Sequence, residues 1–232
     1  AESVGADRLG WYTRSMIGRG MRFFGLARWF WDAVREVNPA DVRADLEQRV
    51  DVAVFGRPGS GRRSLVRALF GPDAEGRPEH GIAIFDLGPG AVAASGRLDL
   101  AILVLNAAEP DWTDERRVAH QVAGRGVPIM LVLTHVDALE RPQQGRGALA
   151  SQFPGHPPEL TALVDPRNVE GTRVALVRKV LATIPGQRMA LGHRYPTLRR
   201  AVADDLIREA ARVNGQLALM SSLPAVIPLL GF

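Results

Sequence analysis

The chain of 232 residues contains no cysteine, which excludes disulfide bonds, thiolate zinc sites and cysteine nucleophiles. Lysine is almost absent as well, because Lys179 is the only one, and arginine carries nearly all of the positive charge. The histidines are scattered over positions 80, 120, 135, 156 and 193. No general base, nucleophile or metal cluster stands out from this distribution, so the sequence predicts no catalytic residue of these kinds.

Composition describes an ordinary globular protein. A hydrophobic content of 46% is ample for a core, and 23% charged residues argue against disorder. The net charge of +4 is modest, and the central part lacks the basic patch with aromatic residues that a nucleic-acid partner would need. The arginine-rich composition is typical of GC-rich coding or thermal adaptation. We therefore expect a bacterial, cytoplasmic protein that does not bind nucleic acid.

The most informative segment is a glycine-rich loop between a predicted strand and a predicted helix. Val50 to Phe55 is a short apolar run, typical of a buried strand. A helix is predicted from Ser64 to Phe70. Between them the spacing G-x-x-x-x-G is formed by Gly56, Arg57, Pro58, Gly59, Ser60 and Gly61. A strand, such a loop and a helix N-terminus together cradle a phosphate through backbone N–H groups.

The two residues after this loop depart from the usual motif, which continues with Lys and then Ser or Thr. Arg62 keeps the positive charge, but a guanidinium is planar and bulkier than an ammonium group. Arg63 replaces a hydroxyl that normally binds Mg²⁺, and a cation repels the metal. Ser64 could supply the hydroxyl only if the helix shifted by one residue. The alternative reading is a glycine-rich turn with no ligand.

Three further apolar runs predict strands that end in polar motifs. Ile82 to Asp86 is followed by Leu87-Gly88-Pro89-Gly90, which resembles the D-x-x-G motif of GTPases with one extra residue. Leu98 to Asn106 is the next strand. Pro128 to Thr134 runs into Thr134-His135-Val136-Asp137, which resembles the Asn/Thr-Lys-x-Asp motif for guanine. His135 stands where that motif has a lysine.

The order and spacing of these motifs resemble the translation-factor-related GTPases of the Era type, over about residues 49–186. Their loops often read GRPNVGKSSL, against GRPGSGRRSL here. The resemblance implies that residues 56–64 surround the phosphates, that Asp86 stands near the metal, and that Thr134 and Asp137 hold guanine beside His135. It implies a motif that covers the base, for which Ala162-Leu163 is the nearest candidate.

One departure from that family concerns switch I. Only Pro72 to His80 separate the first helix from the next strand, and nine residues with two prolines cannot supply both a switch and an edge strand. Switches of this kind depend on contacts with Mg²⁺ and the γ-phosphate. We therefore expect a degenerate G domain that binds GDP or GTP, if any nucleotide, without requiring Mg²⁺.

The N-terminal residues 8–37 combine three of the four tryptophans with five arginines before Asp32. A helix is predicted from about Met21. Aromatic and basic residues on one helix are typical of a segment that lies on a membrane surface. The alternative is a helix that packs on the domain or on another subunit. Charge interrupts the segment too often for it to span a bilayer. Because the chain begins without Met, we expect that a preceding segment has been removed.

The C-terminal part begins with a helix predicted from Pro196 to Asn214. From Gln216 the chain carries no charge over its last 17 residues, so we expect residues 216–232 to be buried or to contact a membrane or partner. Its proline spacing, L-P-x-x-I-P-x-x-G, weakly resembles bacterial proteins with a G domain and a hydrophobic helical tail.

These observations predict an α/β protein with a three-layer P-loop fold and a mostly parallel sheet. We expect an aromatic-basic extension at 1–48, a G-domain-like unit at 49–186, and a C-terminal helix and tail at 187–232. The predicted function is that of a pseudo-GTPase acting at a membrane surface or with a protein partner. The alternatives are a slow GTPase and an interaction module with a relic loop. The sequence does not decide whether the protein forms a homo-oligomer.

Overall fold

The computed structural model describes residues 39–74, 81–139, 142–157, 160–165 and 167–222. The chain divides into two units, Ala1–Asp45 and Leu46–Phe232. Helix α2, Pro39–Glu47, begins in the first unit. The predicted N-terminal segment 8–37 and residues 223–232 of the predicted tail lie outside the described residues. None of the described helices is long and apolar enough to cross a membrane.

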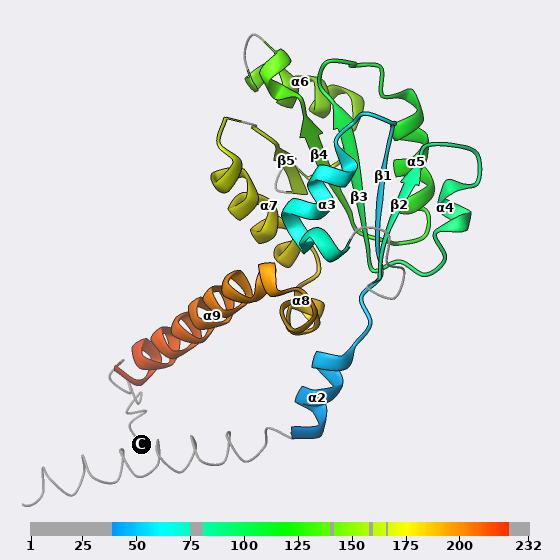
Figure 1. Ribbon diagram of the computed structural model, residues 1–232. Helices are drawn as coiled ribbons and strands as arrows, with labels where there is room; N and C mark the ends of the chain where they lie inside the picture. Colours follow the sequence, from blue (N-terminus) through cyan, green and yellow to red (C-terminus); the bar gives the residue numbers. More distant parts are fainter. Residues whose placement is uncertain (1–38, 75–80, 140–141, 158–159, 166, 223–232) are drawn as a thin grey trace, which may run out of the picture. The chain divides into compact units, whose positions relative to one another are not determined.

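The second unit is built on a parallel sheet of five strands in the order β2-β1-β3-β4-β5 (Figure 1). Four of these strands are nearly continuous apolar runs, as expected for strands covered on both faces. Their bounds are β1 Val52–Gly56, β2 Ile82–Asp86, β3 Leu100–Asn106, β4 Ile129–Thr134 and β5 Thr161–Leu163. Because the strands are parallel, their carboxyl ends and the loops that follow them meet at one edge of the sheet.

Helices cover both faces of the sheet, and alternate strand residues divide the core between them. Val52 and Val54 face one layer and Ala53 and Phe55 the other. The first layer holds α3 Arg62–Phe70, α7 Val169–Thr183, α8 Arg188–Arg194 and α9 Pro196–Ser222. The second holds α4 Ala91–Ala94, α5 Thr113–Ala123 and α6 Pro142–Gln152. Short 3₁₀ turns are η1 Pro72–Ala74, η3 Val136–Ala138 and η5 Pro185–Gln187.

The predicted fold class is thereby confirmed, because the sheet is parallel and lies between two helical layers. The strand at Ile82–Asp86 has the predicted bounds, and the other three predicted strands are present within two residues. The strand β5 was missed, since three residues do not form a periodic pattern. Between Phe70 and Ile82 the described residues contain only η1, and β2 is the last strand on that side of the described sheet.

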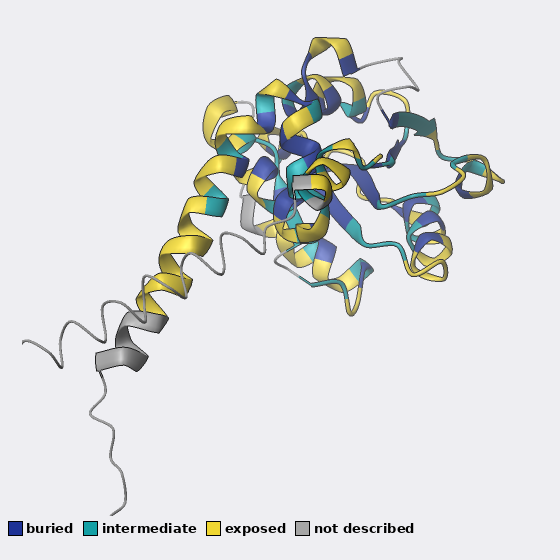
Figure 2. Ribbon diagram, turned by 90° about the horizontal axis from the view of Figure 1, so that it is seen from below, coloured by how far each residue is buried: buried dark blue, intermediate teal, exposed yellow. Residues whose placement is uncertain are grey.

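Helix α9 begins at Pro196, as the sequence predicts, and continues to Ser222, beyond the predicted end. Its first turns are buried at Leu198 and Val202, which pack into the core with Tyr195. From Ile207 to Gln216 every residue is exposed, as Figure 2 shows. The core therefore continues beyond residue 186 into α8 and the start of α9. The division at residue 186 stays a prediction about folding units.

Candidate functional site

The loop after β1, which the sequence predicts to be an anion cradle, carries backbone N–H groups next to the start of α3. Gly59 and Gly61 have φ angles of 82° and 86°, a left-handed conformation that glycine adopts without strain. Gly61 also caps α3, and no side chain bonds to that helix end. In the described part of the chain, the amides of Gly59, Gly61 and Arg62 have no hydrogen-bond acceptor. Donors that converge on a helix N-terminus in this way favour a phosphate.

Glycine is required at position 56 because the loop folds back closely on β1. A Cβ atom at Gly56 would lie 2.7 Å from the Ser60 hydroxyl oxygen and 2.8 Å from the Val104 carbonyl oxygen. Ser60 is 1% exposed, and its hydroxyl has no hydrogen-bond partner among the described residues. The serine hydroxyl therefore points back toward the strand, so the backbone of this loop faces the open side.

Thr134, at the end of β4, ties the loop to the rest of the sheet edge. Its buried hydroxyl lies 2.9 Å from both the Ser60 and Leu105 carbonyl oxygens, to either of which it can donate its hydrogen. In a sheet of this strand order, ligands bind at the carboxyl ends of the strands where the order reverses. The reversal lies between β1 and β3, so Thr134 connects that point with the next motif along the edge.

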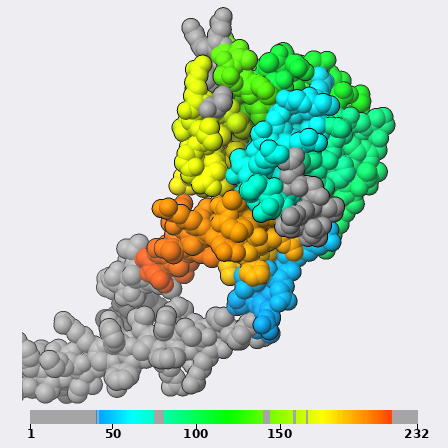
Figure 3. Space-filling view, in the orientation of Figure 1, coloured from blue at the N-terminus to red at the C-terminus, as the bar shows by residue number. Residues whose placement is uncertain are grey.

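A cavity of about 380 Å³ joins the separate motifs of the sequence. The cavity lies between α3, the segment after β4 and the start of α7, and Figure 3 shows α3 in cyan beside α7 in yellow. It is lined by Gly61, Ser64, Leu65, Ala68, Thr134, His135, Asp137, Val164, Asp165, Val169, Thr172, Arg173 and Leu176. The loop and the predicted guanine motif, more than 70 residues apart in the chain, therefore share one hollow.

The segment Thr134 to Asp137 presents a carboxylate to this cavity. His135 has a φ of 55°, and among the described residues it is the one non-glycine in the left-handed region. This turn starts η3, which carries Asp137. The Asp137 side chain accepts no hydrogen bond from the described residues, although it lines the cavity. An exposed carboxylate with two acceptor oxygens is suited to a ligand that offers two adjacent donors.

Arg62 is held at the edge of the sheet by two hydrogen bonds. Its guanidinium donates a hydrogen bond to the Phe85 carbonyl oxygen at 2.6 Å and another to the Asp86 carboxylate at 2.5 Å. The Arg62 side chain is 12% exposed, against 70% for Asp86. Asp86, which the resemblance places near a metal, is thus paired with an arginine. The Asp86 carboxylate therefore already pairs with a cation, and Arg63 supplies no hydroxyl at the position where the usual motif has one.

Arg57, the second residue of the loop, points away from the cavity and toward α5. Its guanidinium lies 3.2 Å from the Glu115 carboxylate and 3.7 Å from that of Asp114. Glu115 is only 2% exposed, and this burial raises the pKa of its carboxyl above 4.5, while Arg57 lowers it in part. The sequence predicts that Arg57 binds nucleotide. In the structure its side chain pairs with α5 and is not among the residues that line the first cavity, and nucleotide binding by Arg57 stays a prediction.

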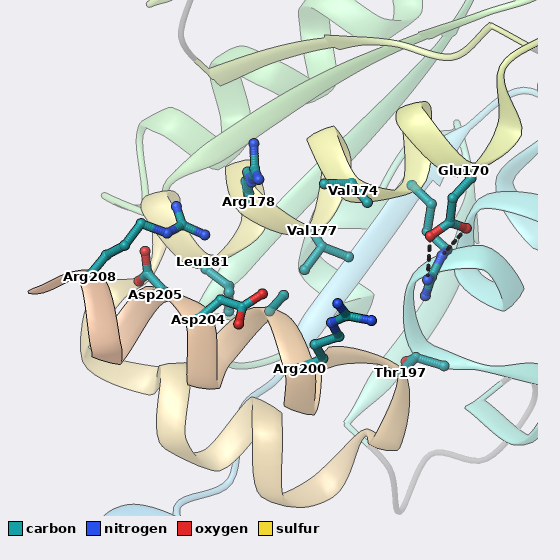
Figure 4. A pocket seen from close by; sticks show the side chains of 12 residues that line it. Glu170, Val174, Val177, Arg178, Leu181, Thr197, Arg200, Asp204, Asp205 and Arg208 are labelled. Atoms are coloured by element: carbon teal, nitrogen blue, oxygen red, sulfur yellow. Dashed lines mark hydrogen bonds and ion pairs between the residues drawn. The ribbon is translucent and has the colours of Figure 1, made fainter.

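A second cavity, of about 350 Å³, lies between α7 and α9 (Figure 4). Val177 and Leu181 form its apolar floor, and arginines from both helices form its rim, including Arg178 and Arg200. Arg173 lines this cavity as well as the first one, and it is paired with Glu170 at 2.8 Å. On α9 the cavity lies beside the first turns, which are partly buried in the core.

The sequence missed the residues that close the far side of the first cavity. Ala162 and Leu163, the predicted base cover, lie inside β5 and line a different cavity. Val164 and Asp165, directly after the strand, line the first cavity instead. The useful signal is Asn168, whose side chain accepts a hydrogen bond from the Gly171 amide and so caps α7. Because Asn168 caps the start of α7, the residues between β5 and α7 form the loop at the carboxyl end of β5, and Val164 and Asp165 belong to this loop.

These features define a P-loop domain of the α/β class. No family model matches the chain, and no curated protein matches it. One similar solved structure is titled "Crystal structure of a probable GTP-binding protein engB", at 14% identity and a TM-score of 0.36. The match covers 59% of this chain and 99% of that chain. This similarity does not single out the Era type.

Proposed function

We propose that this protein is a G-domain-like nucleotide-binding protein that takes up GDP or GTP and hydrolyses GTP weakly or not at all. The observation that carries the proposal is the shared cavity, in which the start of α3 and the Thr134–Asp137 segment face each other. Phosphates at the cradle and a base at Asp137 would occupy the two ends of one ligand. Pockets with a few convergent polar groups are the usual places for such ligands.

Guanine is the base that suits Asp137. Its ring N–H and its 2-amino group are adjacent donors, and a carboxylate can accept both, whereas adenine lacks this pair of donors. We expect GDP to bind at least about tenfold more tightly than ADP, since a hydrogen bond to a charged group contributes roughly 1.5–3 kcal/mol. Titration calorimetry with the two nucleotides measures this difference.

A substitution that reverses the polarity of the contact tests the assignment. Asp137→Asn should weaken GDP and improve xanthosine diphosphate, because xanthine has a carbonyl in place of the 2-amino group and the asparagine amide can donate to it. Asp165→Asn is the matched control, since Asp165 lines the same cavity. Equal affinity for GDP in the native chain and in Asp137→Asn would reject guanine recognition at this position.

Hydrolysis should be weak because the groups that neutralise charge in phosphoryl transfer are altered. Transfer of the γ-phosphate depends on a lysine and Mg²⁺, while this chain has Arg62 paired with Asp86, and Arg63 at the hydroxyl position. Phosphate release from GTP should stay at the protein-free rate in the native chain. The double variant Arg62→Lys with Arg63→Ser should also show no faster release. Phosphate release by the native chain above the protein-free rate would favour the alternative of a slow GTPase, and rapid release would favour an ordinary GTPase.

A third candidate is an interaction module in which the loop is structural only. It is supported if neither nucleotide nor inorganic phosphate binds in calorimetry. Association with a membrane surface or a partner is also part of the proposal. It rests on the sequence of residues 8–37 and 216–232 rather than on described contacts.

A further inference from the structure

We propose that the ion pair between Arg62 and Asp86 takes the place of a divalent cation in this site. The site would then bind a nucleoside diphosphate without metal and in preference to the triphosphate. The inference rests on the proposed nucleotide binding, and it specifies which form of the nucleotide is held.

The geometry fixes the arginine at the sheet edge. Arg62 is the first residue of α3, and its Cδ atom lies 3.0 Å from where a Cβ would stand on Gly56. The side chain thus crosses the end of β1, and its head reaches the end of β2, where Gly56 and Asp86 are paired in register. Its bonds to Phe85 and Asp86 hold the guanidinium in one orientation.

The guanidinium retains donors for a ligand while it is held in this way. An arginine head has five N–H groups, and two are used by the Phe85 carbonyl and the Asp86 carboxylate. The other three can meet phosphate oxygens, for which the planar arginine head has matching geometry. Arg62 can therefore connect Asp86 with a phosphate group, and the connection requires no metal.

A divalent cation has few ligands here. Mg²⁺ binds hard oxygen ligands, whereas Asp86 is engaged and the next helical residue is Arg63. The side chains at this edge of the sheet therefore favour the Arg62 guanidinium, rather than a bound Mg²⁺, as the cation beside Asp86.

The charge count favours fewer phosphates. A magnesium ion would add two positive charges, while Arg62 adds one that Asp86 cancels, and Arg63 adds one more. The charge of Arg57 is taken up by Glu115 and Asp114. Because charges at short range in a partly buried site interact strongly, the additional negative charge of a γ-phosphate is poorly compensated. GDP should therefore bind more tightly than GTP.

Titration calorimetry with GDP and GTP, in Mg²⁺ and in a chelator, tests the proposal on the full chain. We expect the Kd for GDP to change less than about twofold with Mg²⁺, and GTP to bind at least about fivefold more weakly than GDP in both conditions. Binding of GDP that collapses in the chelator, or tighter binding of GTP, would overturn the inference and leave the proposed function intact.

Two variants separate the roles of the pair. Arg62→Gln removes the cation, so metal-free GDP binding should fall at least about tenfold and become dependent on Mg²⁺, since Asp86 then lacks its partner. Asp86→Asn keeps an acceptor for Arg62 but removes the negative charge, so the preference for GDP over GTP should shrink about fivefold. Asp86 is 70% exposed, so this variant should fold normally.

The control is Arg67→Gln, the same change on an exposed residue of the same helix, and it should leave both nucleotides unaffected. If no guanine nucleotide binds, pyrophosphate is titrated instead. Metal-independent pyrophosphate binding that is lost in Arg62→Gln would support the inference and reject the proposed function. No binding of pyrophosphate would reject both.

Discussion

At the scale of single residues, the loop combines backbone donors with side chains whose charges are mostly neutralised inside the protein. Arg57 and Arg62 both lie in or next to the cradle, and each is paired with acidic side chains that the sequence places far away. The net charge offered to a ligand is consequently smaller than the arginine content of the loop indicates. Backbone N–H groups, which cannot be neutralised in this way, carry most of the expected binding.

Thr134 offers a residue-scale test of how the loop is supported. Thr134→Val removes the hydroxyl donor and leaves the Ser60 and Leu105 carbonyls without it. We expect a loss of about 1–2 kcal/mol in the free energy of unfolding, the usual cost of a lost buried hydrogen bond. Urea denaturation measures it, and Thr134→Ser, which keeps the hydroxyl, is the control. Equal stability of the valine variant would show that this bond does not hold the loop.

Glu115 should give the protein a dependence of stability on pH. Burial raises its pKa in the folded protein above 4.5, with Asp114 and Asp111 acting in the same direction and Arg57 against it. At pH values between 4.5 and the raised pKa, the Glu115 carboxyl is therefore mostly protonated in the folded state and mostly ionised in the unfolded state. Stability from this group is present below pH 4.5 and is lost as the pH rises through the raised folded pKa.

Thermal unfolding at a series of pH values checks this expectation. The native chain should lose stability with rising pH over the interval above 4.5, and Glu115→Gln should flatten that part of the profile. A profile that Glu115→Gln leaves unchanged would show that another group is responsible.

At the scale of elements, helix α9 is held to the domain at its beginning and by one ion-pair cluster. Arg188 of α8 donates to Asp205 at 2.6 Å and to Glu209 at 2.8 Å, and its own side chain is 19% exposed. These bonds raise the pKa of Arg188. From Ile207 to Gln216 the residues of α9 are exposed, and Ile207 is 65% exposed.

Arg188→Gln should therefore loosen α9 without unfolding the sheet. Asp205 and Glu209 are more than one third exposed, so solvent screens the pairs and the expected loss is only roughly 0.5–1 kcal/mol. Hydrogen exchange should increase in α8 and α9 but not in β1 or β3. Unaltered exchange in α9 would show that its apolar contacts, at Leu198 and Val202, hold it alone.

At the scale of the whole molecule, the terminal segments predict attachment to a surface. The combination of tryptophan, phenylalanine and arginine in residues 8–37 favours a membrane interface with anionic lipid. Because α8 and α9 contribute to the core, substitutions test this better than a chain cut at residue 186. Trp29→Ser with Phe30→Ser and Trp31→Ser should reduce co-sedimentation with acidic vesicles.

The native chain should sediment with acidic vesicles at low salt, and less at high salt or with neutral vesicles, since screening weakens attraction to the surface. Ile207→Ser, on the exposed part of α9, is the control and should bind as the native chain does. A native chain that stays in solution with every vesicle, and is monomeric by light scattering, would mean that the membrane proposal has to be abandoned.

The sequence by itself determined the fold class and the position of the loop. Short apolar runs such as residues 100–105 favour a buried strand, because they are too short for a typical buried helix and too apolar to lie in water. The spacing of Gly56 and Gly61 is equally local, since it depends on backbone conformation and close packing rather than on distant partners. Helix α9 was found at its start because proline favours the first turn of a helix.

Only the tertiary structure decided which partner each charged side chain takes. The pairing of Arg62 with Asp86 depends on the register of β1 against β2, and that of Arg57 with Glu115 depends on where α5 packs. The short strand β5 exists because β4 supplies its hydrogen bonds, and it brings Asp165 to the cavity. Such contacts join residues far apart in the chain. Local sequence patterns therefore cannot specify them, and the packing of elements at the sheet edge does.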